Sequence, residues 1–515
     1  MRKILRSNKK LQSNSPLPYV SIIVPARNES ATIGRVVRSA KAAFRRCEVI
    51  VIVNGSQDHT AYVARRAGAR VIKFLYPLGH DVGRAIGAKM ARGQILLFMD
   101  GDFVIPAAKL RAFIKPILRG QEIVLNRYSG YADARRIHST SEAKRLLNKW
   151  LGRPDLLGSS LTSVPHAMTK SAAERIGFHQ LAVPPKAYVK ALQLGISATQ
   201  GPFVPVAQWN RRRPIRQGYY NIERMILGDH VEAMHEWMLM RGARAGFTDL
   251  ERKRDIIGTI PRAEIVPLSE GAAPRLSIVI VARNEQNTIQ DVIWTAKQLA
   301  PEEIIVVVNG STDRTAEIVR QQEVKMLEFP IALGHDVGRA VGALQAQGEI
   351  MLFLDGDIVF ETHELWPFIV SCRSGADIAL NDVNSFYSNI QMIDAVSMAK
   401  QFVNRIVCAP HLGYASMTAV PHAMTRHAIE RIGYANLAVP PLAQTIAIVN
   451  GINVTLAPGV DVFQSNRKRL FNSPEHHNLV EQLILGDHAE ALQWLFSHYG
   501  PRVFFPDFMR RREQS

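Results

Sequence analysis

The sequence predicts an α/β protein made of two tandem domains, each built around a mostly parallel β-sheet. Two observations support this prediction: the chain repeats itself once along its length, and within each repeat short apolar segments alternate with segments of helical periodicity. Strands that alternate with helices are joined by right-handed crossovers, so consecutive strands lie parallel in one sheet. Ligands bind such sheets at the carboxyl ends of the strands. We therefore expect the functional residues to follow the strands.

The repeat consists of short segments that recur in the same order at a nearly constant spacing. LGHDVGRA occurs at 78–85 and again at 333–340, and ILLFMDGD at 95–102 recurs as IMLFLDGD at 350–357. A spacing this steady indicates one duplicated unit of the size of a domain. We predict four segments of the chain: a basic disordered tail at 1–18, a first domain at 19–262, a linker at 263–275 and a second domain at 276–515.

Strands and helices alternate from the start of the first repeat. Apolar segments typical of buried parallel strands lie at 19–26, 48–56, 69–75 and 94–102. Segments with helical spacing follow them at 30–44, 58–68 and 83–93. Ser30 is in the position of an N-cap for the first helix, and Gly68 is placed to end the second.

Composition and charge exclude several classes of protein. Of the 515 residues 47% are hydrophobic and 21% charged, which is typical of a globular chain. The net charge of +18 indicates an anionic partner, and because no nucleic-acid-binding signature is present we expect no nucleic acid. Three scattered cysteines indicate a reducing compartment. With no secretory signal and no apolar run of about 20 residues, we predict a cytoplasmic protein or a peripheral one at the inner face of a membrane.

Two D-G-D segments are the candidate metal ligands. Asp100 and Asp102 follow an apolar strand, as do Asp355 and Asp357 in the second repeat. Two carboxylates with open positions suit a divalent cation, Mg²⁺ or Mn²⁺, that takes its other ligands from water and phosphate oxygens. A solvated turn is the alternative, which the recurrence of the pattern in both repeats disfavours.

Two further loops are candidates for binding a phosphorylated ligand. N-G-S-x-D follows a strand at Asn54 and Asp58, and recurs at Asn309 and Asp313; its backbone amides can form an anion site. G-H-D-V-G-R carries Arg84 and, in the second repeat, Arg339, which can grip a diphosphate with two hydrogen bonds. The alternative is the start of a helix with Asp81 as its cap.

Histidines and arginines that recur late in each repeat are further candidates. V-P-H-A-M-T holds His166 and His422, and L-G-D-H holds Asp229, His230, Asp487 and His488. Each histidine could be a metal ligand, a base or a hydrogen-bonded core residue. The arginine clusters 211–213 and 467–469 could hold phosphate or form a solvated surface.

Taken together, these motifs resemble the family 2 glycosyltransferases of the GT-A fold, a Rossmann-like α/β architecture, over both repeats. The opening P-x-x-N-E segment of that family corresponds here to Pro25, Arg27, Asn28 and Glu29. The matching residues of the second repeat are Arg283, Asn284 and Glu285, with Val281 in place of the proline. The resemblance implies an enzyme with a D-x-D motif, a nucleotide-sugar donor, most often a UDP-sugar and otherwise a GDP-sugar, bound through a metal, and an acceptor that the sequence does not identify: a cell-envelope glycan, or a phosphorylated or membrane-associated molecule.

One part of the family pattern is missing. The family usually carries its catalytic base in an E-D motif, but A-V-P-P stands at 182–185 and at 438–441. Three interpretations remain: Asp229, His230 or His166 with their counterparts supplies the base; the reaction is a retaining one, as in the glycosyl-phosphoglycerate synthases that the later part loosely resembles; or the domains bind the donor without turnover. A binding or scaffold protein is therefore the alternative to a transferase.

Overall fold

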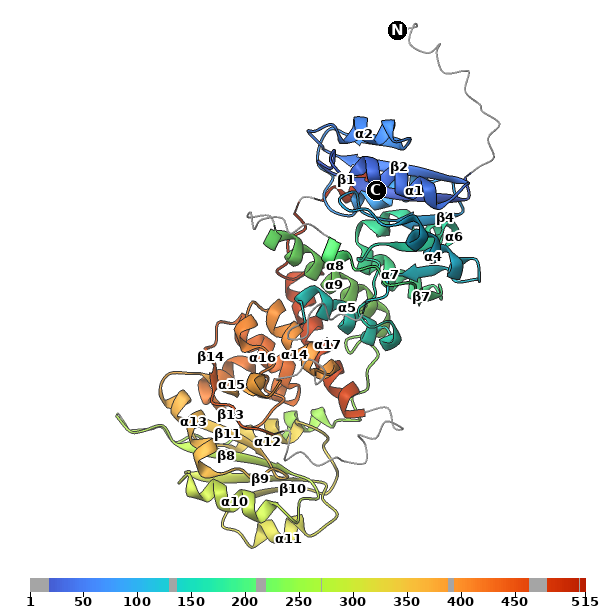
Figure 1. Cartoon of the computed structure of the whole chain (residues 1–515). Coiled ribbons are helices and arrows are strands. Elements are labelled where there is room, and N and C mark those ends of the chain that lie inside the picture. Colours follow the sequence, from blue (N-terminus) through green and yellow to red (C-terminus); the bar gives the residue numbers. More distant parts are fainter. Residues whose placement is uncertain are drawn as a thin grey trace. The chain divides into compact units, whose positions relative to one another are not determined.

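The structure is a computed structural model that describes residues 18–128, 137–209, 219–269, 271–387, 393–462, 479–508 and 510–515. Its contacts form two compact units (Figure 1). In the described part of the chain, the first unit comprises residues 18–128, His138–Ala233 and Phe505–Ser515. The second unit holds Met234–Phe504.

The first unit contains a seven-stranded sheet in the order β3-β2-β1-β4-β6-β5-β7. Strands β1 (Val20–Ala26), β2 (Cys47–Asn54), β3 (Arg70–Phe74) and β4 (Ile95–Phe98) are mutually parallel. Strand β6 (His166–Thr169) runs antiparallel to both β4 and β5 (Ile123–Leu125), and β7 (Ala198–Gln200) is parallel to β5. The predicted α/β fold with a mostly parallel sheet is confirmed.

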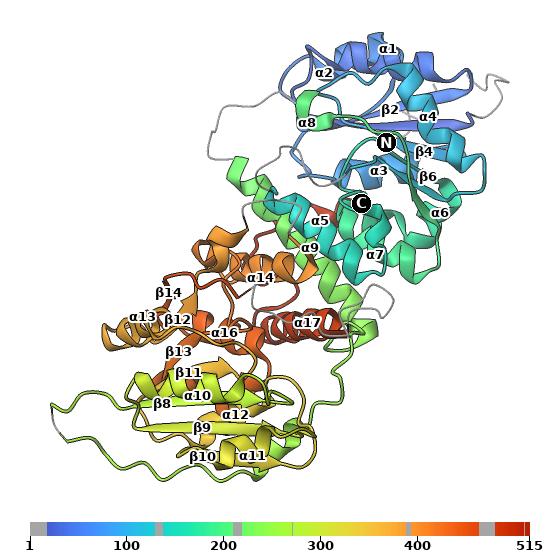
Figure 2. The same cartoon turned by 60° about the horizontal axis from the view of Figure 1, so that its bottom comes forward.

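Helices cover both faces of this sheet (Figure 2). The helices of the first repeat are α1 (Ile33–Ala43), α2 (Thr60–Arg66), α3 (Val82–Met90), α4 (Ala107–Ile117), α5 (Ser139–Trp150), α6 (Lys170–Ile176), α7 (Pro184–Gln193), α8 (Val206–Trp209) and α9 (Tyr219–Arg241), with 3-10 turns η1 (Pro154–Leu156) and η2 (Phe178–Ala182). Residues of α9 from Met234 onward belong to the second unit. Helix α3 approaches β1 closely: a Cβ on Gly87 would lie 2.4 Å from Ile23 Cγ2. The glycines of the G-R-A-I-G segment thus bring the helix that carries Arg84 against the sheet.

The second unit repeats this architecture with a seven-stranded sheet in the order β10-β9-β8-β11-β13-β12-β14. Its strands are β8 (Leu276–Ala282), β9 (Glu303–Asn309), β10 (Lys325–Phe329), β11 (Ile350–Asp355), β12 (Ile378–Asn381), β13 (His422–Thr425) and β14 (Val454–Ala457). Its helices are α10 (Ile289–Gln298), α11 (Thr315–Arg320), α12 (Val337–Gln345), α13 (Thr362–Arg373), α14 (Ala395–Ile406), α15 (Arg426–Ile432), α16 (Pro440–Val449) and α17 (Leu479–Tyr499), with turns η4 (Val383–Phe386), η6 (Pro410–Leu412) and η7 (Tyr434–Ala438). Buried apolar residues form one core on each face of the sheet.

Two predicted caps differ from the structure. Helix α1 begins at Ile33 with Thr32 as its N-cap, so Ser30 lies before the helix; its amide instead donates to Asp58 Oδ2 at 3.0 Å. Asp81 does precede α3, but its side chain makes no cap hydrogen bond. Gly68 follows α2 with a φ of 89°, as a helix-ending glycine does.

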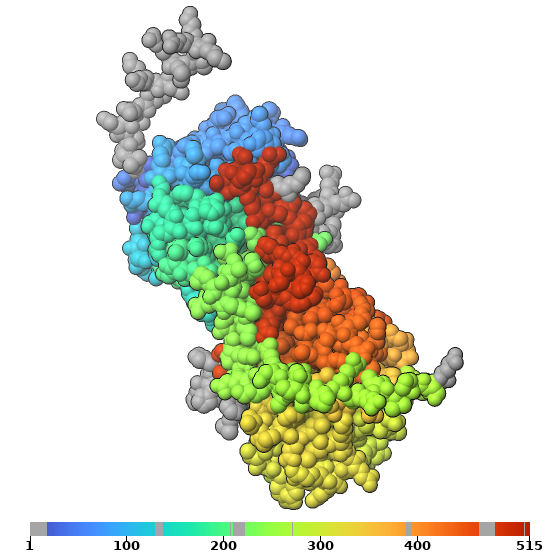
Figure 3. Space-filling view, turned by 180° about the vertical axis from the view of Figure 1, so that it is seen from behind, coloured from blue at the N-terminus to red at the C-terminus, as the bar shows by residue number. Residues whose placement is uncertain are grey.

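Two short segments pack on the unit that does not contain the rest of their own repeat. Residues 234–260, including turn η3 (Arg254–Thr259), belong to the second unit, and Phe505–Ser515, including η9 (Arg512–Gln514), belong to the first. Figure 3 shows the dark red C-terminal residues on the blue part of the first unit and the light green residues along the yellow part of the second. The predicted ranges 19–262 and 276–515 follow the sequence repeat, whereas packing groups the residues differently.

No helix among the described residues is both long and apolar enough to cross a membrane.

Candidate active site

The loops that follow β1 and β2 are joined by hydrogen bonds at the carboxyl edge of the first sheet. Asn28 Oδ1 accepts from the amide of Gln57 at 2.9 Å, and the amide of Asn28 donates to Ser56 Oγ at 3.0 Å. The φ of Asn28 is 58°, in the left-handed region that asparagine tolerates better than most residues. The second unit makes the same bonds with Asn284, Ser311 and Thr312. These asparagines therefore shape the loops.

Asp58 also joins the two loops. Its Oδ2 accepts from the amide of Ser30 at 3.0 Å, and its Oδ1 accepts from the amide of Thr60 at 3.0 Å. Although partial burial opposes the shift, a bond from the Thr60 hydroxyl and these two amide bonds hold the pKa of Asp58 at about 2. Asp313 makes the corresponding bonds to Gln286 and Thr315 and also has a lowered pKa. Both carboxylates are ionised near neutral pH, and both accept hydrogen bonds from backbone amides of the loops.

Asn54, at the end of β2, holds the next loop in place. Its Nδ2 donates to the carbonyl of Gly79 at 2.9 Å, and its Oδ1 accepts from the amide of Leu78. Asn309 binds Leu333 and Gly334 in the same way. The side-chain amides of the predicted donor-binding asparagines thus form hydrogen bonds with the backbone of the G-H-D loop. Their contact with a nucleotide stays a prediction.

Arg84 links the G-H-D loop (79–81) to Asp100 and Asp102, which we call the acidic pair. It is only 4% exposed, and its Nη1 lies 2.9 Å from Asp81 Oδ1 while its Nη2 donates to Asp100 Oδ1 at 3.1 Å. Burial opposes ionisation of Asp81, but Arg84 and His80 together hold the pKa of that carboxyl far below its ordinary value. The second unit has the same arrangement at Arg339, Asp336 and Asp355. Each guanidinium is therefore paired with the chain's own carboxylates.

The two carboxylates of the acidic pair flank a glycine that lies close to β1. A Cβ on Gly101 would lie 3.1 Å from Ala26 Cβ and 3.2 Å from the Pro25 carbonyl oxygen, so β1 passes directly beside the turn. Asp100 and Asp102, on either side, offer hard oxygen ligands, which fit Mg²⁺ or Mn²⁺. Asp100 shares its carboxylate with Arg84, so a metal there would compete with or join that ion pair.

The remaining residues of the opening motif lie around this turn. Pro25, the residue before the end of β1, lies against α3, where a Cβ on Gly83 would lie 3.3 Å from its Cβ. Arg27 is exposed, and Glu29 Oε2 accepts from Thr32 Oγ1 at 3.2 Å. In the second unit Arg283 is exposed and Glu285 is buried. The exposed arginines are free to move toward a ligand at the same edge.

His166 and His422 are buried next to the acidic pairs' strands. His166, the first residue of β6, stacks on Phe98 of β4 with ring centroids 4.8 Å apart, and its Nδ1 donates to the Ser163 carbonyl at 2.9 Å. Burial, aided by the charge of Arg84, lowers the pKa of His166 to about 3. His422 stacks on Phe353 and has a pKa of about 3 for the same reasons. Both are neutral imidazoles, which suits a ligand or hydrogen-bond acceptor better than a base.

The L-G-D-H segments lie inside long helices. His230 is fully buried in α9, its Nδ1 donates to the Ile226 carbonyl at 2.7 Å, and burial lowers its pKa to about 3. Asp229 is 1% exposed, and both of its oxygens accept from the guanidinium of Arg510. In α17, Asp487 binds Arg252 in the same way, and His488 has a pKa lowered by burial to about 4. Candidates for the base are thus either neutral or held in buried ion pairs.

Sequence reasoning missed two lysines near these groups. Lys144, in α5, donates to Ser163 Oγ at 2.9 Å and lies 5.7 Å from the centre of the Tyr128 ring. Burial of the ammonium, together with the charge of Arg84, lowers its pKa to about 8. Lys400 in α14 has a pKa that burial lowers to about 8 as well. The available signal was the recurrence of S-x-A-K-x-x-x-N at 141–148 and 397–404.

Several predicted features lie outside the described residues. These are the arginine clusters 211–213 and 467–469 and residues 1–17 of the basic tail.

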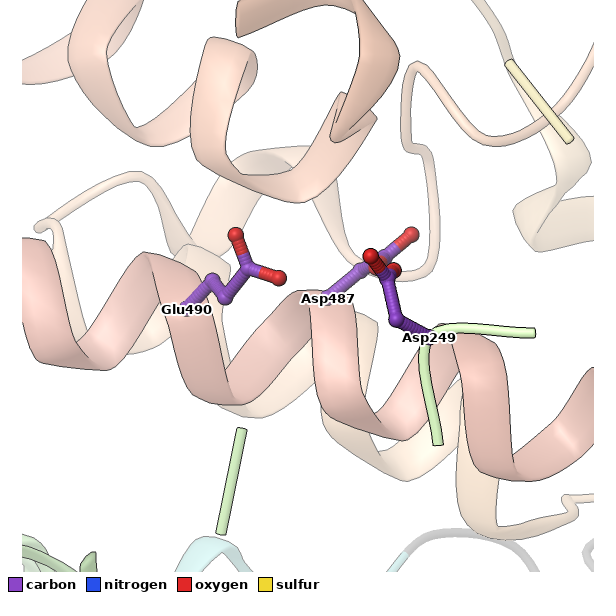
Figure 4. A group of neighbouring side chains, drawn as sticks. All are labelled: Asp249, Asp487 and Glu490. Carbon is purple, nitrogen blue, oxygen red and sulfur yellow. The ribbon is translucent and has the colours of Figure 1, made fainter. Parts of the chain in front are cut away.

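Three carboxylates of the second unit lie close together, with oxygens of Asp249, Asp487 and Glu490 within 4.8 Å of one another (Figure 4). Each is paired with arginine: the guanidinium groups around them belong to Arg244, Arg252 and Arg254. Because three cations already balance three anions, this cluster is an ion-pair network rather than a second metal site.

Comparison with known proteins decides the family. A model described as glycosyl transferase family 2 matches residues 21–176 and 277–389, just over half of the chain and part of each repeat. The chain belongs to glycosyl transferase family 2. Both repeats of this family 2 protein contain the acidic pair inside the matched regions.

Similar proteins cover parts of this family 2 chain. It is 27% identical over 189 residues to 4,4'-diaponeurosporenoate glycosyltransferase of Staphylococcus haemolyticus, which covers 35% of this chain and 48% of that protein. It is 25% identical over 119 residues to undecaprenyl-phosphate 4-deoxy-4-formamido-L-arabinose transferase of Pseudomonas paraeruginosa, covering 21% of this chain and 35% of that protein. The chain thus spans half or less of the length of these curated relatives.

Solved structures include similar chains as well. Glucosyl-3-phosphoglycerate synthase from Mycobacterium tuberculosis, in complex with Mn²⁺, uridine diphosphate and glucosyl-3-phosphoglycerate, is 20% identical. The similarity covers 42% of this chain and 80% of that chain, with a TM-score of 0.34. The family match confirms the predicted membership of the family 2 glycosyltransferases.

Proposed function

We propose that the protein transfers a sugar from a nucleotide-sugar donor, a UDP-sugar or a GDP-sugar, to an anionic acceptor with the help of a divalent cation. The observation that carries this proposal is the acidic pair at the carboxyl end of β4 and again of β11, each tied to a buried arginine. A glycosyl transferase family 2 chain with two such edges has the ligands for two donor sites.

In this proposal Asp100 and Asp102 hold the metal, with Asp355 and Asp357 in the second unit. A cation bound there would neutralise charge on the departing nucleoside diphosphate. Arg84 holds Asp100 in place at 3.1 Å, and the exposed Arg27 is available to the diphosphate.

We further propose that the acceptor hydroxyl gives its proton to a phosphate oxygen of the departing nucleoside diphosphate rather than to a side chain, and that the reaction retains the anomeric configuration. No carboxylate stands at 182–185 or 438–441, where the family usually has its base. Asp229 and Asp487 are held by arginines, and His166 and His422, with pKa values of about 3, are poor bases at neutral pH. Nuclear magnetic resonance of the product tests this, because an inverted anomer would require a base.

The anionic nature of the acceptor is supported by positive charge at the site. The charge of Lys144 interacts with that of Arg84, which binds Asp100, Lys400 is its counterpart in the second repeat, and the chain has a net charge of +18. One relative has undecaprenyl phosphate, a lipid with an anionic head, in its name. We propose a phosphorylated or cell-envelope acceptor, reached at the inner face of a membrane.

The decisive experiment measures nucleoside diphosphate release over a panel of UDP- and GDP-sugars with Mg²⁺ or Mn²⁺. We expect Asp102→Asn to remove the turnover of the first unit and Asp357→Asn that of the second. In the double variant, the rate of nucleoside diphosphate release should fall at least 100-fold. Glu317→Gln, at an exposed position of α11, is the control. Turnover that survives in the double variant, or that is unaffected by chelation, would contradict the metal site.

The alternative function is binding of a nucleotide sugar without turnover, favoured by the absent E-D motif. It predicts that UDP or GDP binds in a metal-dependent manner in calorimetry and that Asp102→Asn and Asp357→Asn weaken this binding. It also predicts that no nucleoside diphosphate is released from any donor, even when candidate anionic acceptors are present.

A further inference from the structure

A second repeated motif lies at the end of each repeat. D-L-E-R-K-R at 249–254 matches D-F-M-R-R-R at 507–512. We call residues 244–260 the first-repeat tail and residues 505–515 the second-repeat tail. The first-repeat tail belongs to the second unit, and the second-repeat tail belongs to the first unit. The motif thus recurs at the two places where the end of one repeat packs in the unit formed by the other repeat.

The second-repeat tail is tied to the first unit by its arginines. The side chain of Arg510 is 1% exposed; its Nη1 donates to Asp229 Oδ2 at 2.9 Å and to the Ala182 carbonyl at 3.1 Å. Arg512 makes two further bonds to Glu232, at 2.8 and 2.9 Å. A buried, bidentate arginine–carboxylate pair is strongly directional, so the tail is held in one position.

The same tail lies on the loop that leads to the acidic pair. The amide of Arg511 donates to the Leu78 carbonyl at 2.9 Å, and a Cβ on Gly79 would lie 2.6 Å from Arg510 Cγ. The charge of Arg510 also helps to lower the pKa of Asp81, the partner of Arg84. A continuous row of charges therefore runs from the tail through Asp81 and Arg84 to the acidic pair.

The first-repeat tail makes the matching contacts in the second unit. Arg252 Nη1 donates to the Ala438 carbonyl at 2.7 Å and to Asp487 Oδ2 at 3.1 Å. The amide of Lys253 donates to the Leu333 carbonyl at 2.8 Å, and a Cβ on Gly334 would lie 2.6 Å from Arg252 Cγ. Ile257, just beyond, is buried in the core beside α12. The two tails thus make equivalent contacts in the two units.

We propose that each repeat supplies the positioning residue for the other repeat's donor loop: Arg510 for the loop at 78–84, and Arg252 for the loop at 333–339. The two donor sites then depend on each other in a crossed manner, and neither repeat alone is a complete donor site. The role of these loops in catalysis rests on the proposed function, but the positioning of the loops by the tails does not. Asp229 and Asp487 are accordingly anchors for the tails rather than bases.

Hydrogen exchange on the full chain tests the positioning directly. In Arg510→Lys, which keeps the charge but loses the two-pronged bond, we expect amides of 78–90 to exchange at least tenfold faster, with 333–345 unchanged. Arg252→Lys should do the reverse. Glu513→Gln and Asp255→Asn, exposed residues at equivalent places in the two tails, are matched controls. Faster exchange in the loop of the same repeat, in both loops equally or in neither would overturn the proposal.

Donor kinetics separate this inference from the proposed function. With Asp357→Asn present, so that only the first unit works, Arg510→Lys should raise KM for the donor at least tenfold and Arg252→Lys should leave KM unchanged; with Asp102→Asn the pattern reverses. Crossed exchange without any donor turnover would leave the tails as positioning elements and refute only the enzyme. Turnover without the crossed KM pattern would refute the inference and leave the enzyme intact.

Discussion

The two units are nearly identical at the edge with the acidic pair and differ on the wall formed by α5 and α7 in the first and by α14 and α16 in the second. Arg84 donates to Asp100 at 3.1 Å, and Arg339 donates to Asp355 at 3.0 Å. By contrast, Tyr188 of α7 occupies the position that Gln444 occupies in α16. Duplication has preserved one side of each site and changed the other.

The change on that wall alters its hydrogen bonds. Gln444 Nε2 donates to Asn404 Oδ1 at 2.7 Å, and Gln444 Oε1 accepts from the amide of Met417 at 2.8 Å. The buried hydroxyl of Tyr188 has no hydrogen-bond partner among the residues that the structure describes. We expect the two units to use the same kind of donor and different acceptors.

A second difference lies beside the buried lysines. Lys144 donates to Ser163, whereas Ala419 stands at that place in the second unit. The chain before α14 contains the turn η4, and Tyr387 OH lies 2.8 Å from Ser397 Oγ, as Tyr128 OH lies 3.0 Å from Ser141 Oγ. The wall has therefore been rebuilt around a tyrosine–serine pair that both units retain.

The largest expected effect tests the conserved edge. Arg84→Ala leaves the buried Asp81 without its guanidinium, and removing one partner of a buried ion pair costs about 3–5 kcal/mol. Arg339→Ala should cost less in the second unit, because the side chain of Asp336 is 17% exposed and that of Asp81 only 2%. Both losses are measured as the free energy of unfolding in urea, and an equal loss would mean that the burial of the carboxylate does not set the cost.

The second effect tests the altered wall and should be unequal. Gln444→Leu leaves the Met417 amide and Asn404 Oδ1 unpaired, which we expect to cost about 2–3 kcal/mol. Tyr188→Phe removes a hydroxyl without a partner in the described chain, so the free energy of unfolding should stay the same or rise by about 1 kcal/mol. A loss in Tyr188→Phe would mean that the hydroxyl makes a bond that matters.

A third effect concerns pH. Lys144 and Lys400 have pKa values lowered to about 8, so each is charged below that pH and neutral above it. Binding of inorganic pyrophosphate should therefore weaken between pH 7 and 9.5, by about threefold to tenfold, which corresponds to roughly 1 kcal/mol. Lys144→Arg, charged at all these pH values, should remove the first unit's part of the decrease. An unchanged pH profile would place the lysines outside the anion site.

The same lysines predict a sign for stability. Because the folded pKa lies below the ordinary value of a lysine in the unfolded chain, the unfolded chain binds more protons between pH 8 and about 10. The free energy of unfolding should rise over that range, and Lys144→Met should flatten the rise.

How much of this could be predicted from the sequence depends on how far apart the interacting residues are in the chain. The strands and the acidic pair follow from local periodicity, and Asp100 lies where it was expected, after β4. Ser30 was wrongly predicted as a cap because α1 begins only at Ile33, and Ser30 lies in a loop, where its amide bonds to Asp58, 28 residues later. A loop that bonds to another loop gives no local signal.

The tails show the limit more clearly. Asp229 and Arg510 are 281 residues apart, so L-G-D-H resembles a catalytic motif until its partner is known. Lys144 was missed because lysine in an amphipathic helix is usually solvated, whereas here it lies beside Arg84 and Ser163. Buried charge pairs are set by tertiary packing, which a single sequence reveals only through repeated motifs.

The smallest expected effect returns to the conserved edge. Asp58→Ala removes the acceptor of two backbone amides, those of Ser30 and Thr60, in loops near the surface, so we expect a loss of about 1 kcal/mol. Asp313→Ala should lose a similar amount. Because the folded pKa of Asp58 is about 2, below its ordinary value, its contribution should be present above pH 4 and fade as the pH falls toward 2. Thermal unfolding of wild type and variant should converge at low pH; a difference that persists at pH 2 would mean that packing around the side chain, rather than its charge, joins the two loops.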